Sequence, residues 1–407
     1  MKTLKQSHAA ISTVLAFALI PLSGFATDVY IPSFPAMADF FGTSRGDIQL
    51  SLIVFVISSG VSQLFVGSLL DSFGRYRISL GALLIFAISS FVIALTGSLP
   101  VLLAMRVVQG MAVALIVVGK RAFFMDIYSG AQLKHYTSLF AIVWSTAPII
   151  APFIGGFLQF YFGWESNFYF LGLATLTILL FELVYSGETL KTFHPFKIRP
   201  LLNVYASVLK TPDYTLSVLI LGLCFADVIL YNMASPFIIE NVFHQSAVAT
   251  GNSSLLSGLA VMMGGLLSKS LIHKAITEKM LIAGPVIFVS AALSVVVLYF
   301  FPNLVAMMVM VMLLHIGSGF TFNTFYTYAL GRFSKNAGIL SGITGGGTFI
   351  VTSIVSYAIV SLLHIQTLVM LGVGYLVIAS FISLSLILFV HAHKRRMVEQ
   401  LQAAPAV

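Results

Sequence analysis

Long apolar runs, separated by short polar connections, make up most of the chain. Strands of a membrane β-barrel would give alternating segments of about ten residues, whereas these runs are continuous and about twice that length. A helix that crosses a bilayer needs about 20 apolar residues. The pattern therefore predicts an all-α polytopic membrane protein with twelve transmembrane helices, near residues 8–30, 46–69, 77–97, 101–123, 136–160, 167–186, 214–239, 252–272, 280–300, 303–327, 337–361 and 368–391.

The composition supports this interpretation and removes several other classes. Of the 407 residues, 59% are hydrophobic and 8% are charged, whereas soluble domains carry about 25% charged residues. The chain cannot cover itself with a surface that faces water, so we expect the lipid bilayer to surround it. Its single cysteine, Cys224, excludes an internal disulfide and a cysteine-based zinc or iron–sulfur site.

The positions of the basic residues predict the orientation of the helices. With twelve crossings, all of the 21 Lys and Arg residues except Arg45 and Arg106 fall in connections, span ends or termini on one side of the membrane. By the positive-inside rule that side is cytoplasmic, and both termini lie there. We expect a multi-pass protein of the bacterial inner membrane. The net charge of +8 then reflects topology and does not indicate nucleic-acid binding.

The N-terminus has a second interpretation. Lys2 and Lys5, the apolar run that follows and the small residues of 23–26 resemble a secretory signal peptide. Cleavage would leave eleven crossings and remove Asp28, so we favour an uncleaved first span.

The longest polar connection divides the predicted spans six to six and contains three prolines. Two parallel bundles of six helices are a common plan among transporters. A faint internal similarity supports duplication, because Gly67–Ser72 resembles Gly264–Lys269 and the Tyr30…Pro35 segment resembles Tyr231…Pro236. We expect an N-terminal bundle at 1–186, a cytoplasmic linker at 187–213, a C-terminal bundle at 214–391 and a cytoplasmic tail at 392–407.

Six short motifs follow one another along the first half. They are Asp28-Val-Tyr-Ile-Pro32-Ser-Phe-Pro35, Gly67-Ser-Leu-Leu-Asp71-Ser-Phe-Gly74-Arg75-Tyr-Arg77, Arg106-Val-Val-Gln109-Gly110, Pro148-Ile-Ile-Ala-Pro152-Phe-Ile-Gly155-Gly156, Gly163-Trp164 with Phe168, and Gly187-Glu188-Thr189-Leu190. In this order and topology they resemble the major facilitator superfamily, and within it the Bcr/CflA-type branch of twelve-span drug:proton antiporters. The resemblance implies two pseudo-symmetric six-helix bundles. At Tyr76 and Glu165 the chain departs from the basic residues usual in these motifs.

The second motif predicts a conformational latch at the cytoplasmic surface. An acid or a base at a helix end can interact with a neighbouring helix terminus or with an opposite charge. Asp126 lies 20 residues beyond Arg106, about 30 Å at helical rise, and is the expected partner of Arg75. The resemblance implies that such contacts latch the outward-open state; the alternative is an ordinary solvated loop. The predicted latch residues are Gly67, Asp71, Gly74, Arg75, Arg77 and Asp126.

The fifth span carries Pro148, Pro152, Gly155 and Gly156. Prolines free backbone groups and glycines permit close contact between helices in a membrane. A plain kink explains these residues almost as well. The resemblance implies an antiporter signature, because bending and tight packing are needed at this position.

Ionisable residues inside the membrane give the strongest functional signal, since each is costly to bury unless it has a partner or water. Asp28 near the end of span one and Arg106 in span four lie at similar depth. An acid that binds a proton in one state and an arginine in another would couple transport to protons. The alternative is a static structural ion pair. Gln109 lies nearly one turn from Arg106, on the same face, and is expected to bind substrate.

A second group of polar residues is expected to line the substrate path. Asp227 lies in the middle of span seven, with Tyr231 and Asn232 close by, and His315 and Asn323 lie in span ten. Tyr30, Trp144 and Tyr231 could stack on an aromatic substrate. His315 has an alternative role as a hydrogen-bonded packing residue. Glu182, near the cytoplasmic end of span six, is expected to be structural.

No enzyme motif, cofactor motif or metal-ligand pattern is found in the sequence. We therefore expect a monomeric secondary transporter, driven by the proton gradient without a cofactor. It would exchange protons for an outgoing organic molecule by rocking the two halves. One rival is a proton-coupled carrier of a siderophore or other polar metabolite. Another is a receptor or sensor that transports nothing.

Overall fold

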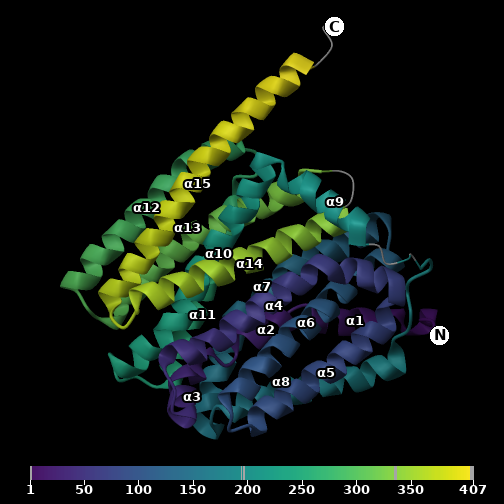
Figure 1. Ribbon diagram of the computed structural model, residues 1–407, viewed down its shortest axis with the longest axis horizontal. Helices are drawn as coiled ribbons and strands as arrows, with labels where there is room; N and C mark the ends of the chain where they lie inside the picture. The colour runs from purple at the N-terminus through teal and green to yellow at the C-terminus, as the bar shows by residue number, and fades with distance from the viewer. Residues whose placement is uncertain (1, 194, 196–197, 334–336, 404–407) are drawn as a thin grey trace. The chain divides into compact units, whose positions relative to one another are not determined.

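The computed structural model describes residues 2–193, 195, 198–333 and 337–403 and is helical throughout (Figure 1). Within these residues the only β-type pairing is a single bridge between Thr3 and Glu188. The α-helices are α1 (Ala9–Leu19), α2 (Leu22–Asp28), α3 (Phe34–Phe41), α4 (Arg45–Phe73), α5 (Arg75–Leu95), α6 (Leu99–Ile127), α7 (Gly130–Phe162), α8 (Glu165–Tyr185), α9 (Ile198–Leu209), α10 (Pro212–Asn241), α11 (Ala247–Ser270), α12 (Ile276–Phe300), α13 (Leu304–Gly331), α14 (Ala337–Leu363) and α15 (Leu368–Ala403).

The helices confirm the predicted all-α membrane architecture. In the described part of the chain, ten helical stretches are long and apolar enough to cross a membrane, and 146–162 of α7 adds a shorter one. The remaining predicted span coincides with α11, which is richer in serine and glycine. Every predicted span thus falls on a helix. The linker also contains a helix, α9, that the hydropathy pattern did not predict.

The first predicted span is broken into short helices. Pro21 lies between α1 and α2, and Pro32 lies in a 3-10 turn, Ile31–Ser33, that precedes α3. Proline has no N–H to donate and clashes with the preceding turn, so it ends or kinks a helix. The consequence is that α2 ends at Asp28 inside the protein, where its last carbonyls are free to accept other hydrogen bonds.

The chain forms two compact units. The first comprises residues 1–197 with 232–258, and in it α4 and α5 pack against α6, α8 against α5, and α2 against α7. The second comprises 198–231 with 259–407, and in it α12 packs against α13 and α15. Each of α10 and α11 is thus shared between the units. The predicted boundaries at 186 and 214 stay a prediction.

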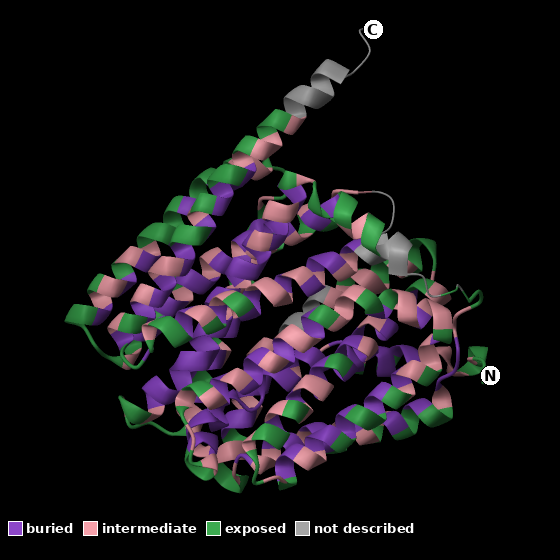
Figure 2. Ribbon diagram, viewed as in Figure 1, coloured by how far each residue is buried: buried purple, intermediate pink, exposed green. Residues whose placement is uncertain are grey.

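Large apolar side chains are exposed along the helices in both units. On α12 and α15, for example, Leu281, Val289, Phe381 and Leu388 are exposed on one side, while the opposite side is buried (Figure 2). Soluble proteins rarely expose apolar area on this scale. Lipid chains are the solvent in which such a surface is stable.

Candidate functional site

Arg106 on α6 is completely buried and lies beside the C-terminus of α2. Its Nη1 donates hydrogen bonds to the Ala26 carbonyl at 3.0 Å and to Gln109 Oε1 at 2.8 Å, and its Nε donates to the Ser51 carbonyl at 3.3 Å. A helix C-terminus carries unsatisfied carbonyls and a partial negative charge, and both stabilise a cation. The break in the first span therefore creates the site that holds this arginine.

Two aromatic rings enclose the guanidinium. It lies 4.5 Å from the ring centre of Tyr30 and 4.2 Å from that of Phe55. An arginine between ring faces gains cation–π stabilisation, which is larger when water is excluded. Nη2 of Arg106 is nevertheless buried without a hydrogen-bond partner among the described residues. The arginine thus retains an unused donor.

Gln109 and Tyr30 support Arg106 in this structure and are not open to a substrate. Both are completely buried. Gln109 Nε2 donates to Ser90 Oγ at 2.8 Å, and the Tyr30 hydroxyl lies 3.0 Å from Ser51 Oγ. The sequence predicted both as substrate-binding residues, and that role stays a prediction.

Asp28 and Arg106 are both buried and form no ion pair with each other in this structure, and their predicted exchange of partners stays a prediction. Asp28 Oδ1 instead accepts a hydrogen bond from Asn232 Nδ2 on α10 at 3.2 Å. No ion pair forms because backbone carbonyls and Gln109 hold Arg106, while the side-chain amide of Asn232 bonds to the carboxylate of Asp28. Asn232, predicted to contact substrate, is here the partner of Asp28.

The proline–glycine run of α7 makes the close contacts that the sequence indicated. An added Cβ at Gly155 would lie 1.6 Å from the Val29 carbonyl oxygen, directly after Asp28. At Gly156 it would lie 2.6 Å from the Ala247 carbonyl oxygen of α11. Pro148 and Pro152 both lie inside the helix. The run therefore packs α7 against the turn that carries Asp28, and its role as an antiporter signature stays a prediction.

The second unit buries a carboxylate of its own. Asp227 on α10 is 2% exposed, and its Oδ2 accepts a hydrogen bond from Ser318 Oγ on α13 at 2.7 Å. Tyr231, one turn along α10, contacts the His315 ring edge-on with centroids 5.7 Å apart, and His315 contacts Tyr375 of α15 in the same way at 6.2 Å. The structure thus brings Asp227, Tyr231 and His315 into one cluster, and it adds two residues that the sequence did not indicate.

Two other predicted substrate residues lie elsewhere. Asn323 is exposed and faces Gly265 of α11, two turns from His315. Trp144 lies in α7, but its side chain is outside the part of the chain that the structure describes.

Ion pairs connect three residues of the predicted latch, whose role in a transport cycle stays a prediction. Arg75 at the start of α5 pairs with Asp126 at the end of α6 and with Asp71 at 3.1 Å, and it donates to the Ala122 carbonyl at 2.8 Å. Gly67 and Arg77 do not take part. An added Cβ at Gly67 would meet nothing within 4 Å, and Arg77 is exposed and forms no ion pair with a described residue.

Glu188, to which the sequence gave no role, organises this loop. Its carboxylate accepts hydrogen bonds from the backbone N–H groups of Arg75 and Tyr76, each at 3.1 Å, and from those of residues 189 and 190. Gly74 has φ of +92°, and a Cβ there would lie 2.6 Å from Glu188 Oε2. A carboxylate at a helix N-terminus is stabilising. The carboxylate of Glu188 can approach the start of α5 this closely only because residue 74 is a glycine.

A buried ion pair lies nearby. Lys120 Nζ and Glu182 Oε2 are 2.6 Å apart, and the Glu182 side chain is completely buried. Glu182 was expected to be structural, and this ion pair joins α8 to α6.

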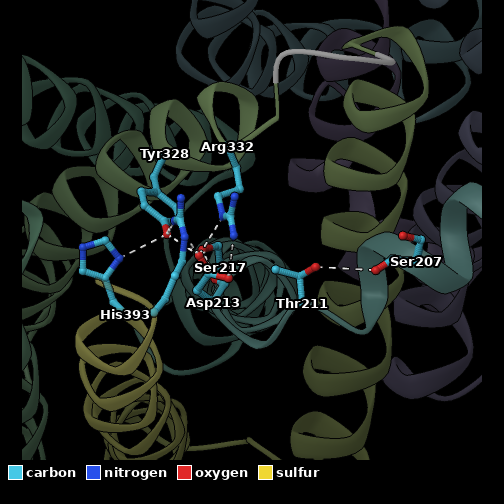
Figure 3. Close-up of polar contacts among 8 residues, drawn as sticks. Ser207, Thr211, Asp213, Ser217, Tyr328, Arg332 and His393 are labelled. Atoms are coloured by element: carbon cyan, nitrogen blue, oxygen red, sulfur yellow. Dashed lines mark hydrogen bonds and ion pairs between the residues drawn. The ribbon is translucent and has the colours of Figure 1, made fainter. Parts of the chain in front are cut away.

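Asp213 holds a corresponding cluster in the second unit (Figure 3). Its Oδ2 accepts hydrogen bonds from the Tyr328 hydroxyl at 2.6 Å, from Arg332 Nε at 2.7 Å and from Arg396 Nη1 at 3.0 Å. The Tyr328 hydroxyl also lies 3.2 Å from His393 Nδ1. One carboxylate at the start of α10 therefore ties α13 and α15 together.

The apolar helices form a multi-pass membrane protein, and comparison with known families gives its class. The sequence model of the protein family described as Major Facilitator Superfamily matches residues 16–356, which is most of the chain. The chain belongs to the major facilitator superfamily. It is accordingly a multi-pass transporter of a small molecule and not an enzyme.

Its relatives include proteins named for drug resistance. The multidrug resistance protein MdtL of Shewanella sp. is 25% identical over 381 residues, which cover 92% of this chain and 94% of the relative. The bicyclomycin resistance protein homolog of Haemophilus influenzae is 32% identical over 206 residues, 51% of each chain. Among solved structures, the nucleoside transporter NupG is 16% identical with a TM-score of 0.70, covering 95% of this chain and 99% of its own. This last likeness concerns the fold alone.

Proposed function

We propose that the chain is a proton-driven exporter of small organic molecules of the Bcr/CflA type, working as a monomer in the bacterial inner membrane with both termini in the cytoplasm. The names of the drug-resistance relatives support export. The tight packing of α7 supports an antiporter, and the one-sided distribution of Lys and Arg supports the orientation.

Asp28 is the proposed proton carrier and Arg106 its alternate partner. The observation that carries this proposal is that Asp28 is bonded to Asn232 of α10, while Nη2 of Arg106 is buried without a partner. A buried carboxylate without a cation is costly when ionised and is stabilised by binding a proton. When α10 withdraws Asn232, the carboxylate can lose its proton and turn to the free donor of Arg106. Proton release would then be linked to the movement of α10.

The ion pairs around Arg75 would act as the conformational latch of this cycle. Arg75 bridges Asp71 and Asp126, which lie at the ends of two helices. Because these side chains are partly exposed, the contacts are weak enough to break in each cycle.

Proton coupling is tested with purified protein in liposomes that enclose a pH-sensitive dye, with ethidium and chloramphenicol as probes. The native protein is expected to move protons when either probe is added. Asp28→Asn is expected to abolish this proton movement while still exchanging probe for probe across the membrane. Asp39→Asn, which changes an exposed carboxylate in the same way, is the matched control and is expected to behave as the native protein does.

Two results would overturn the proposal. One is an Asp28→Asn variant that still couples protons to the probe. The other is a native protein that moves no protons with either probe but takes up a ferric siderophore down a proton gradient, which would favour the carrier of polar metabolites. That second candidate requires a substrate to reach Asp227 and His315, and both are enclosed here. Binding without any exchange would indicate a receptor.

A further inference from the structure

The proposed switch does not use the cluster around Asp227. Like Asp28, Asp227 is a buried carboxylate with no cationic partner among the described residues. Asp227 forms no ion pair with a described residue. Ser318 on α13 donates a hydrogen bond to it, and Cys224 on α10 and Tyr375 on α15 lie within electrostatic range of it. The ring of His315 on α13 contacts the rings of Tyr375 and Tyr231, which border this group. Among these, His315 is the one that can become a cation.

The cluster has no room for an organic molecule. Asp227 and its neighbours Cys224, Tyr231, His315, Ser318 and Tyr375 are each between 0% and 2% exposed. A substrate carried through the protein would have to displace several packed helices to touch them. A proton needs no such space, because hydroxyl and imidazole groups can pass it on.

Static packing does not explain the carboxylate well. A buried charge without a cation destabilises a membrane protein, and a serine or asparagine could make the hydrogen bond to Ser318 at lower cost. The Tyr375 hydroxyl is also buried without a hydrogen-bond partner among the described residues. A group of exchangeable hydrogens around one carboxylate is the arrangement that a proton-binding site needs.

α10 connects this carboxylate to the proposed switch. Asp227 and Asn232 lie on the same continuous helix, five residues or about 7.5 Å apart along its axis. Asn232 holds Asp28, and Asp227 is held by Ser318 of α13. A movement of α10 that changes the surroundings of one carboxylate therefore changes those of the other.

We propose that Asp227 is a second proton-carrying carboxylate, so that two protons are exchanged in each transport cycle. This inference rests on the proposed function. On loading, a proton adds to a carboxylate oxygen of Asp227 and gives the neutral acid, and Ser318 changes from donor to acceptor as its hydroxyl rotates. On release, the proton returns to water and the O–H bond of the acid is broken. No electrons are transferred.

Infrared difference spectroscopy of the purified protein tests the site without any substrate. Spectra are recorded from about pH 5 to about pH 10, a range in which perturbed carboxyl groups titrate. The carbonyl band of protonated carboxyl groups is expected to contain one pH-dependent component that Asp227→Asn removes and another that Asp28→Asn removes. Asp39→Asn is expected to remove neither, because Asp39 is exposed.

The Ser318→Ala variant guards against misfolding of Asp227→Asn. It keeps the carboxyl group and removes its hydrogen-bond donor, so it is expected to shift the frequency of the Asp227 component. The proposal is overturned if no component depends on Asp227 at any pH, because the residue then stays ionised. It is equally overturned if the component is constant across the range, because the residue then never releases its proton.

The number of protons is measured from the chloramphenicol gradient that proteoliposomes sustain at an imposed pH difference. Exchange of two protons sustains about a hundredfold gradient per pH unit and exchange of one about tenfold, because each proton contributes about 1.4 kcal/mol per unit. Asp227→Asn is expected to reduce the gradient about tenfold, and an unchanged gradient contradicts a second proton. If the native protein does not move chloramphenicol, the proposed export fails for this probe, while the infrared result still decides the role of Asp227.

Discussion

Substitution of Gly155 by alanine is expected to damage the protein at the turn that carries Asp28. The new Cβ would lie 1.6 Å from the Val29 carbonyl oxygen, whereas ordinary contacts begin at 3.4 Å, so α7 and this turn must separate by about 1.8 Å. Overpacking of this kind costs about 1–3 kcal/mol, more than the roughly 1 kcal/mol that alanine gains over glycine in a helix. A displacement of more than 1 Å at a reacting group can reduce a rate about a hundredfold.

Gly67→Ala is the matched comparison. Gly67 belongs to the loop motif that resembles the superfamily signature, yet its added Cβ would meet nothing within 4 Å. We expect this variant to keep its stability or gain about 0.5–1 kcal/mol. The midpoint of thermal denaturation in detergent and the initial rate of ethidium efflux measure both variants. Equal stability of Gly155→Ala and the native protein, or a comparable loss in Gly67→Ala, would refute the packing argument.

Four further outcomes follow from contacts in the first unit. Lys120→Met is expected to lower the free energy of unfolding by about 3–5 kcal/mol, because it leaves Glu182 buried without a cation. Adding Glu182→Leu to the same chain is expected to restore most of that loss, and thermal denaturation of both variants decides the point. Glu188→Ala is expected to cost about 0.5–2 kcal/mol, because two N–H groups of α5 lose their acceptor. Glu188→Gln, which keeps one acceptor oxygen, is expected to recover part of this, and equal losses would show that the hydrogen bonds are unimportant.

The fold could be predicted from hydropathy because a helix in lipid needs a long apolar sequence, whichever helices it packs against. The interruption of the first span at Pro21 and the turn at Pro32 directly after it could also have been predicted from these two prolines. The linker helix α9 was missed because it is short and lies in a polar segment. The extent of α15 was underestimated for a related reason, because its last turns beyond 391 are polar and carry no hydropathy signal.

The candidate site was predictable only in part. Arg75 and Asp126 could be paired because their distance along the helices placed them at the same surface. The depth of Asp28 and Arg106 was a sound guide to their burial. Their hydrogen-bond partners in this structure depend on where carbonyls and amides from other helices lie. Glu188 follows a glycine in a short motif that was noted without a role. Its function depends on Gly74, more than one hundred residues away, which no local pattern connects to it.

The cluster around Asp213 has a mechanical consequence. The carboxylate lies one residue after Pro212, where the linker becomes α10, and it pairs with Arg332 of α13 (Figure 3). It also pairs with Arg396 of α15. A force that reaches α10 through the linker would therefore not act on α10 alone, because Asp213 bonds this end of the helix to two others. The force would be shared among α10, α13 and α15, so these three helix ends would move together.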